Sequence, residues 1–495
     1  MSNTQPPIDN IVVLMLENRS FDNILGALKP NSSQFEGLVL DGSMSNTYNG
    51  NPYPVTNVSS LTEPLTTPTP DPGESFQDMN LQIFGNTDGT GTATMGGFVN
   101  DWMAVPGEYP YIPTDKECLL APSWPCLPRS PDPNTPCKAS PSPGDIMYYY
   151  TTSGASPQLP VSGWLASNFA VSDAWFGSSP TQTFPNRFFV NCGTAGGYVQ
   201  DVDYVCNLEI WPDLPSIFEL LDGGGSPNAA NWTVYFHDYS IATMIKYVLE
   251  APDLVRNYDN SDFGNDTKNP TFLDAIANQT LPKYSFIEPR YGGINNLPPN
   301  SNHPPANVLE GEILLANVYN ALAQSEYYWP RTLLIVTYDE HGGCFDHVVP
   351  PKATPPDGTV LRNASSFGFD RYGPRVPAIV ISPHIAAGTV LRPENFAYNA
   401  VTSGITTTNG TTPFDHTSII KTVIECFNIQ VDGKQANLTQ RDLNAPSLLP
   451  ALTLSSSNMN SPGPVTVPAP PATAVSSDTN HLYEIYQAMI KRFGL

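Results

Sequence analysis

Two runs of apolar residues in this chain end abruptly in acidic and amide side chains. The run IVVLML is followed by Glu17 and Asn18, and the run LLIVTY is followed by Asp339 and Glu340. Unbroken apolar runs of this length are typical of strands that are buried on both faces, as in parallel sheets. In open α/β sheets, ligands bind at the carboxyl ends of the strands. We therefore expect these four side chains to lie at one edge of a sheet.

Further apolar segments alternate with patterns of helical period. We predict strands over 231–240, 281–291 and 376–385. We predict one helix that begins at Asp145 and three more over 161–169, 304–325 and 415–427. Helices that alternate with buried strands indicate an α/β fold. We predict a central, mostly parallel sheet flanked by helices on both faces.

The chain divides into one large domain and a short C-terminal extension. We predict a domain over 1–453, with long loop insertions at about 45–75 and 107–145, where Pro, Ser, Thr, Asn and Asp occur without periodicity. A Pro/Ser/Ala-rich tether over 454–480 then leads to a helix over 481–495. The apolar residues of that helix predict that it docks back on the domain.

Charge and composition exclude some partners. The net charge is −24 with only 22 Lys and Arg residues, so a nucleic-acid partner is not expected. No stretch reaches the roughly 18 apolar residues of a membrane span, and the first ten residues do not resemble a signal peptide. We expect a soluble chain, which is secreted if an N-terminal segment has been removed and cytoplasmic otherwise. In an exported protein, the cluster of Cys118, Cys126 and Cys137 could hold a disulfide between two of its members.

The segment SSPTQTFPNRFF carries candidate nucleophiles. Thr183 stands two residues before Pro185, a residue favoured in the first turn of a helix, where backbone N–H groups attract anions. Thr181 is the rival nucleophile, and the spacing to Pro185 favours Thr183. Arg187 could form a bidentate contact with a substrate phosphate, or a salt bridge that fixes the helix.

The oxygen donors after the two apolar runs predict a site for one divalent cation. Carboxylate and amide oxygens suit hard cations, and Mg, Ca, Mn and Zn all remain open. Such a cation would supply the local positive charge that an acidic chain needs to bind a phosphate.

Four motifs in this order have a counterpart in a known family. ENRSFD begins at Glu17, TFPNR at Thr183, HPP at His303 and DEHGG at Asp339. Together they resemble the phosphoesterase family of phospholipases C and acid phosphatases, within the alkaline-phosphatase-like superfamily. The resemblance spans roughly residues 10–428, and it implies an alkaline-phosphatase-like fold.

The resemblance also implies roles for individual residues. Glu17 and Asn18 match the first pair of metal ligands in the family, and Asp339 and Glu340 match the second pair. Thr183 matches the nucleophile, which also contacts the metal.

His303 matches the histidine of the H-P motif, and His237 lies where the family often has a histidine that contacts the phosphoryl group. One departure is that no histidine precedes His237, although some members carry an active-site histidine in that region. The roles of His341, His347 and His416 stay open, and His341 could support the neighbouring ligands.

Three functions are compatible with these residues. The first is metal-dependent phospholipase C-type cleavage of a phospholipid head group through a phospho-threonine, with transient contact to a membrane surface. The second is an acid phosphatase or general phosphomonoesterase, which the missing histidine disfavours. The third is an inactive protein that keeps an anion pocket, which the intact set of ligands and nucleophile disfavours.

Overall fold

The computed structural model describes most of the chain. The described residues are 8–30, 32–61, 64–104, 142–201, 204, 213–259, 269–293, 297–356, 366–399 and 404–471. The predicted helix over 481–495 lies outside these ranges. Cys118, Cys126 and Cys137 also lie outside them.

An eight-stranded sheet forms the centre of the molecule. Its order is β12-β6-β11-β10-β1-β9-β7-β8, and only β11 runs antiparallel to its neighbours. The strands are β1 (Asn10–Leu16), β6 (Ala170–Ser172), β7 (Trp232–Phe236), β8 (Val255–Asn257), β9 (Tyr284–Ile287), β10 (Thr332–Tyr338), β11 (Ala378–Ile381) and β12 (Thr389–Val390). Every residue of β1 and β10 is buried, as their unbroken apolar runs predict.

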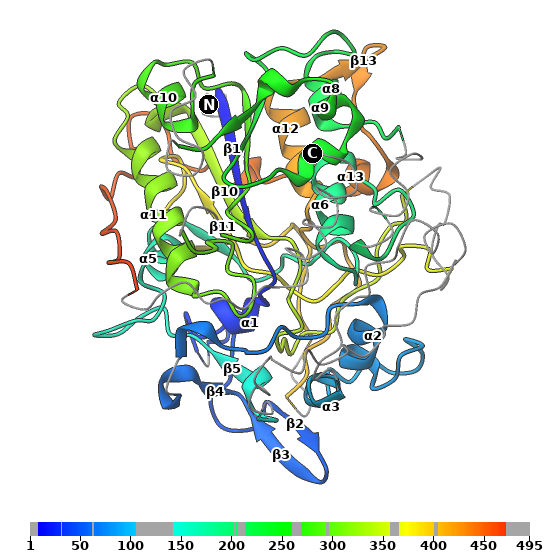
Figure 1. Cartoon of the computed structure of the whole chain (residues 1–495). Coiled ribbons are helices and arrows are strands. Elements are labelled where there is room, and N and C mark those ends of the chain that lie inside the picture. Colours follow the sequence, from blue (N-terminus) through cyan, green and yellow to red (C-terminus); the bar gives the residue numbers. More distant parts are fainter. Residues whose placement is uncertain are drawn as a thin grey trace, which may run out of the picture.

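Helices cover both faces of this sheet, which confirms the predicted α/β fold (Figure 1). One face carries α5 (Pro160–Asn168), α10 (Phe272–Ala277) and α11 (Val308–Ala323). The other carries α6 (Thr183–Cys192), α8 (Ile217–Leu221), α9 (Lys246–Leu249), α12 (Thr417–Cys426) and α13 (Gln440–Asn444). No helix in the described ranges is long and apolar enough to span a bilayer.

The register of the sheet brings the motifs together. Leu16 of β1 pairs with Tyr338 of the parallel strand β10, so Glu17 and Asp339 leave the sheet side by side. On the other side of β1, the parallel strand β9 ends at Ile287, which pairs with Leu14. The carboxyl ends of these strands therefore form one edge, as the two apolar runs predict.

The region after β1 contains small elements beside that edge. A short helix α1 (Phe21–Ile24) follows β1, and the later elements are β2 (Ser45–Tyr48), β3 (Asn51–Pro54), β4 (Thr56–Asn57), α2 (Phe76–Phe84) and α3 (Phe98–Ala104). Residues 71–74 are buried, so the predicted insertion 45–75 does not run wholly over the surface. The helix predicted from Asp145 is wrong in extent. Asp145–Met147 form one 3₁₀ turn before the strand β5 (Tyr148–Tyr149), which pairs with β4.

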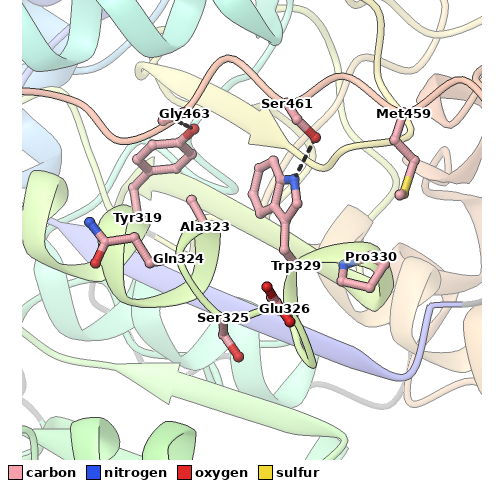
Figure 2. Close-up of a pocket in the computed structure, with 10 residues that line it drawn as sticks. All are labelled: Tyr319, Ala323, Gln324, Ser325, Glu326, Trp329, Pro330, Met459, Ser461 and Gly463. Carbon is pink, nitrogen blue, oxygen red and sulfur yellow. Dashed lines mark hydrogen bonds between the residues drawn. The ribbon is translucent and has the colours of Figure 1, made fainter.

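The described end of the chain packs on the domain. The Tyr319 hydroxyl donates to the Gly463 carbonyl, and the Trp329 Nε1–H donates to the Ser461 hydroxyl (Figure 2). A pocket of about 360 Å³ lies here, between the end of α11 and residues 459–463. It adjoins the start of β10, so the length of that strand, roughly 20 Å, separates it from Asp339. This pocket is therefore distinct from the predicted site.

Candidate functional site

Glu17 and Asp339 form the buried acidic part of the site. Arg187 of α6 holds them, with its Nε 3.0 Å from Asp339 Oδ2 and its Nη2 3.8 Å from Glu17 Oε1. Neither carboxylate oxygen of Glu17, which is fully buried, makes a hydrogen bond of normal geometry. Burial raises the pKa of Glu17 well above its ordinary value, the Asp339 charge raises it further, and Arg187 and the Ser301 side chain oppose the shift. One arginine thus faces two buried acids.

Asn18 connects the acids to the predicted nucleophile. Its backbone has a φ of 53°, a left-handed conformation that asparagine tolerates better than most residues. Its backbone N–H donates to Asp339 Oδ1 (3.1 Å), and its side-chain Oδ1 accepts from the Thr183 hydroxyl (3.3 Å). The turn after β10 packs tightly here, since a Cβ on Gly342 would lie 1.9 Å from the Asn18 carbonyl oxygen. Gly342 therefore permits the two motifs to approach each other.

Thr183 is the first residue of α6, as the helix start predicted from Pro185 requires, and the structure buries it fully. The Phe184 N–H donates to Asp201 Oδ1 (2.7 Å), and Pro185 has no N–H. Among the first three helical residues, only the Thr183 N–H lacks a partner in the described part of the chain, and it is the one donor that this helix start retains for an anion. The helix start thus offers fewer donors than the sequence alone suggests.

Thr181 and Arg187 have clear structural contacts. The Thr181 hydroxyl lies 2.5 Å from the Ser179 hydroxyl, and its carbonyl accepts from the Asn186 amide (2.7 Å). Arg187 adopts the salt bridge that the sequence left open as one of its two roles, and its Nη2 also donates to the Met15 carbonyl. A contact between Arg187 and substrate stays a prediction.

His303 lies beside two acids that the sequence analysis did not select. Its Nδ1 donates to the Pro304 carbonyl (2.7 Å) and lies 3.4 Å from Asp71 Oδ1, while its Nε2 lies 3.6 Å from Glu74 Oε1. Glu74 Oε1 also accepts from Asn18 Nδ2 at 2.6 Å. A continuous chain of contacts therefore runs from Thr183 through Asn18 and Glu74 to His303.

Glu340 and His341 lie next to each other in the turn after β10. Glu340 Oε2 accepts from the Gly342 N–H (2.8 Å) and lies 3.2 Å from His341 Nδ1. His341 Nε2 donates to Gln82 Oε1 at 2.6 Å, and burial lowers the pKa of His341 to about 3. His341 is therefore neutral, and because its proton lies on Nε2, its Nδ1 makes no hydrogen bond to Glu340.

His237 follows β7 and belongs to a separate cluster. Its ring stacks on Tyr258 with centroids 4.6 Å apart, and its Nδ1 lies 3.2 Å from the Glu288 carbonyl oxygen. Burial and the Arg290 charge lower the pKa of His237 to about 4. No hydrogen bond or ion pair in the described residues joins His237 to the other predicted site residues.

Two other histidines, His416 and His347, hold the segments around the site in place. His416 Nε2 donates to the Asp339 backbone carbonyl at 2.6 Å, and Trp175 Nε1 donates to its other ring nitrogen. His416 thus fixes the end of β10. His347 lies 2.6 Å from Asp22 and 3.1 Å from Glu36, and it connects α1 to the segment after DEHGG.

The donors at the site suit a divalent cation by their chemistry, but only some of them lie at the spacing of metal ligands. The Glu17 oxygens are buried without hydrogen bonds of normal geometry, and such a charge is costly unless a counter-ion compensates it. Among His, Cys, Asp and Glu in the described ranges, only Asp71, Glu74 and His303 have ligand atoms that all lie within 4.8 Å of one another. The carboxylates of Glu17, Asp339 and Glu340 do not meet that spacing.

Asp71 and Glu74 are the site residues that sequence reasoning missed. They lie in a Pro-rich stretch, PTPDPGES, whose composition suggests a surface loop. The available signal was the capping box of Ser75 and Asp78, which marks a helix start directly after Glu74.

Comparison with known proteins identifies the family. The sequence model of the Phosphoesterase family matches residues 8–430. Non-specific phospholipase C1 of Arabidopsis thaliana is 34% identical over 451 residues, which cover 88% of this chain and 69% of that protein. Phospholipase C B of Mycobacterium tuberculosis is 28% identical over 471 residues, which cover 87% of this chain and 75% of that protein. This chain belongs to the Phosphoesterase family, and it is a hydrolase that acts on phosphate esters.

Similarity to solved structures is lower. The lipoteichoic acid synthase LtaP from Listeria monocytogenes is 14% identical with a TM-score of 0.36, over 69% of this chain and 87% of that chain. A protein in the alkaline phosphatase superfamily from Vibrio parahaemolyticus is 12% identical with a TM-score of 0.32, over 59% of this chain and 64% of that chain.

Proposed function

We propose that this chain is a metal-dependent phospholipase C that transfers the phosphoryl head group of a phospholipid, such as phosphocholine, to Thr183 with diacylglycerol as the leaving group, and then to water. One observation carries the proposal: Thr183 is the first residue of a helix, and its buried hydroxyl contacts Asn18 beside an acid without hydrogen bonds of normal geometry. That acid is Glu17, the neighbour of Asn18 in the chain. The names of the relatives, non-specific phospholipase C and phospholipase C, support the substrate class.

Glu17, Asn18, Thr183, Asp339 and Glu340 are the residues that would hold the cation. A bound divalent cation lowers the pKa of a hydroxyl and offsets charge on the phosphoryl oxygens. The chain itself buries the nucleophile at the sheet edge, orients it through Asn18 and offers the Thr183 N–H to the incoming anion.

His303 is the proposed proton donor to the departing alkoxide. It is buried, and its Nδ1–H is engaged with the Pro304 carbonyl, so its Nε2 is the atom that can carry a proton to the leaving group. In the proposal, His237 contributes to phosphoryl binding. The domain that performs this reaction is proposed to extend over 1–453.

A substrate panel tests the proposed substrate class. We expect phosphatidylcholine vesicles to give diacylglycerol and phosphocholine, and we expect p-nitrophenylphosphorylcholine to be cleaved faster than p-nitrophenyl phosphate. Faster release of inorganic phosphate from the monoester, with no diacylglycerol, would instead identify a phosphomonoesterase.

A further inference from the structure

The Asn18 side chain has two ends that differ in chemistry but hardly in shape. The oxygen can bind a cation or accept a hydrogen bond, whereas the nitrogen can only donate. Which end faces Thr183 is therefore decided by the groups around the amide. Asn18 is fully buried, so water does not decide it.

Glu74 supplies the deciding contact. Its Oε1 lies 2.6 Å from Asn18 Nδ2, a short distance typical of a hydrogen bond to a charged acceptor. A carboxylate oxygen next to the amide oxygen would be repelled, so Glu74 holds the nitrogen on its own side. Asn18 Oδ1 then faces Thr183 Oγ1, 3.3 Å away.

Glu74 is itself held in place. It lies between Gly73 and the capping box of α2, and only 3% of it is exposed. The Gly73 carbonyl accepts from Gln82 Nε2 at 2.8 Å, which ties this turn to α2. Asp71 and His303 lie close to Glu74, and His303 Nε2 is 3.6 Å from the same oxygen, Glu74 Oε1. The acceptor that orients Asn18 is therefore rigid.

We propose that Glu74 is a positioning residue for the nucleophile, which orients the Asn18 amide so that its oxygen faces Thr183. This inference rests on the proposed function, because it gives Asn18 Oδ1 its role beside the nucleophile and the cation. It also assigns a function to a residue outside the four motifs.

A double-mutant cycle tests this role. We expect Glu74→Met to lower kcat on p-nitrophenylphosphorylcholine by about 10- to 100-fold, as loss of a group that orients a ligand does, with a smaller change in KM. In Asn18→Asp both terminal atoms of the side chain are oxygens, so it no longer matters which one faces Thr183. Glu74 now repels the new carboxylate. Adding Glu74→Met to Asn18→Asp should therefore raise kcat and Mn²⁺ affinity, the latter measured by calorimetry.

Two further variants keep the test falsifiable. Glu74→Gln retains a side-chain oxygen that can accept from Asn18 Nδ2, and it should restore most of the kcat lost in Glu74→Met. Glu312→Gln removes another buried carboxylate, one that binds the start of α5 at Val161 and Ser162, and it controls for loss of stability alone. Glu312→Gln should lower the melting temperature and leave kcat close to the wild-type value.

The outcomes separate this inference from the proposed function. An equal loss of kcat on adding Glu74→Met to the wild type and to the Asn18→Asp variant would overturn the inference, since Glu74 would then act without the Asn18 amide. Wild-type rates in Glu74→Met would overturn it as well. If the wild-type enzyme is active on p-nitrophenylphosphorylcholine but never carries phosphocholine on Thr183, the proposed function fails by itself.

Discussion

At the scale of single residues, the site is a set of buried acids with too little positive charge around it. Glu17 makes no hydrogen bond of normal geometry at either oxygen, and Arg187 reaches it only at 3.8 Å. Burial and Asp339 raise the pKa of Glu17, which shows that the metal-free site disfavours its charge. A cation would relieve this cost, so cation binding and folding should be coupled.

We predict opposite effects of Glu17→Gln on binding and stability. The variant should lose most of its affinity for Mn²⁺, while the metal-free protein should become about 1–2 kcal/mol more stable because glutamine removes an acid whose ionisation burial opposes. Calorimetry and thermal melts in a chelator measure the two effects. Asp71→Asn is the matched variant from the neighbouring acid cluster. Retained affinity in Glu17→Gln together with loss in Asp71→Asn would place the cation with Asp71, Glu74 and His303.

His303→Ala should slow the release of poor leaving groups most. A proton donor matters more for a basic alkoxide than for nitrophenolate, so kcat/KM should fall more for an alkyl ester than for its nitrophenyl analogue. The comparison needs only steady-state rates on the two esters. An equal fall on both would show that His303 binds the phosphoryl group and donates no proton.

At the scale of elements, His347 joins α1 to the segment that follows DEHGG. Burial opposes its charge, but Asp22 and Glu36 outweigh burial and raise the pKa of His347 to about 9. Its charged form therefore stabilises the fold fully below the ordinary pKa near 6.5, and this stability is lost as the pH rises through about 9. The pKa values of Asp22 and Glu36 are lowered in turn, mainly by His347, against the effect of burial.

We predict that the free energy of unfolding falls by on the order of 3 kcal/mol between about pH 6 and pH 10 through this residue. Denaturant titrations at these pH values should show a weaker dependence in His347→Gln than in the wild type. The same slope in both proteins would contradict the assignment. His384→Gln is the control at a second buried histidine, whose ring nitrogens lie near the carbonyls of Leu454 and Pro330.

The sequence predicted the elements that carry the four motifs because burial on both faces leaves a strong signal. The runs before Glu17 and Asp339 have no polar interruption, and both are strands paired in register. Glu74 left no such signal, because its burial depends on the packing of a Pro-rich turn against His303. His237 shows a different limit: the end of its strand was predicted, but the stacking of its ring on Tyr258 was not.

At the scale of the whole molecule, the net charge of −24 bears on substrate access. An acidic protein is repelled by anionic lipid surfaces, and salt screens this repulsion over about 10 Å at 0.1 M. We therefore predict that salt raises the rate on vesicles rich in anionic phospholipid and changes the rate on phosphatidylcholine vesicles little. Rates at low and at physiological salt decide this. A rate on anionic vesicles that falls with salt would show that a local basic surface dominates.

The central claim is that Thr183 carries the phosphoryl group during turnover. Acid-quenched enzyme, digested and examined by peptide mass spectrometry, tests it most directly. With p-nitrophenylphosphorylcholine as the substrate, we predict phosphocholine esterified to Thr183 and retention of configuration at a chiral phosphorothioate, with nearly all activity lost in Thr183→Ala and substantial activity kept in Thr181→Ala. Phosphocholine on Thr181, or inversion at phosphorus, would contradict the claim.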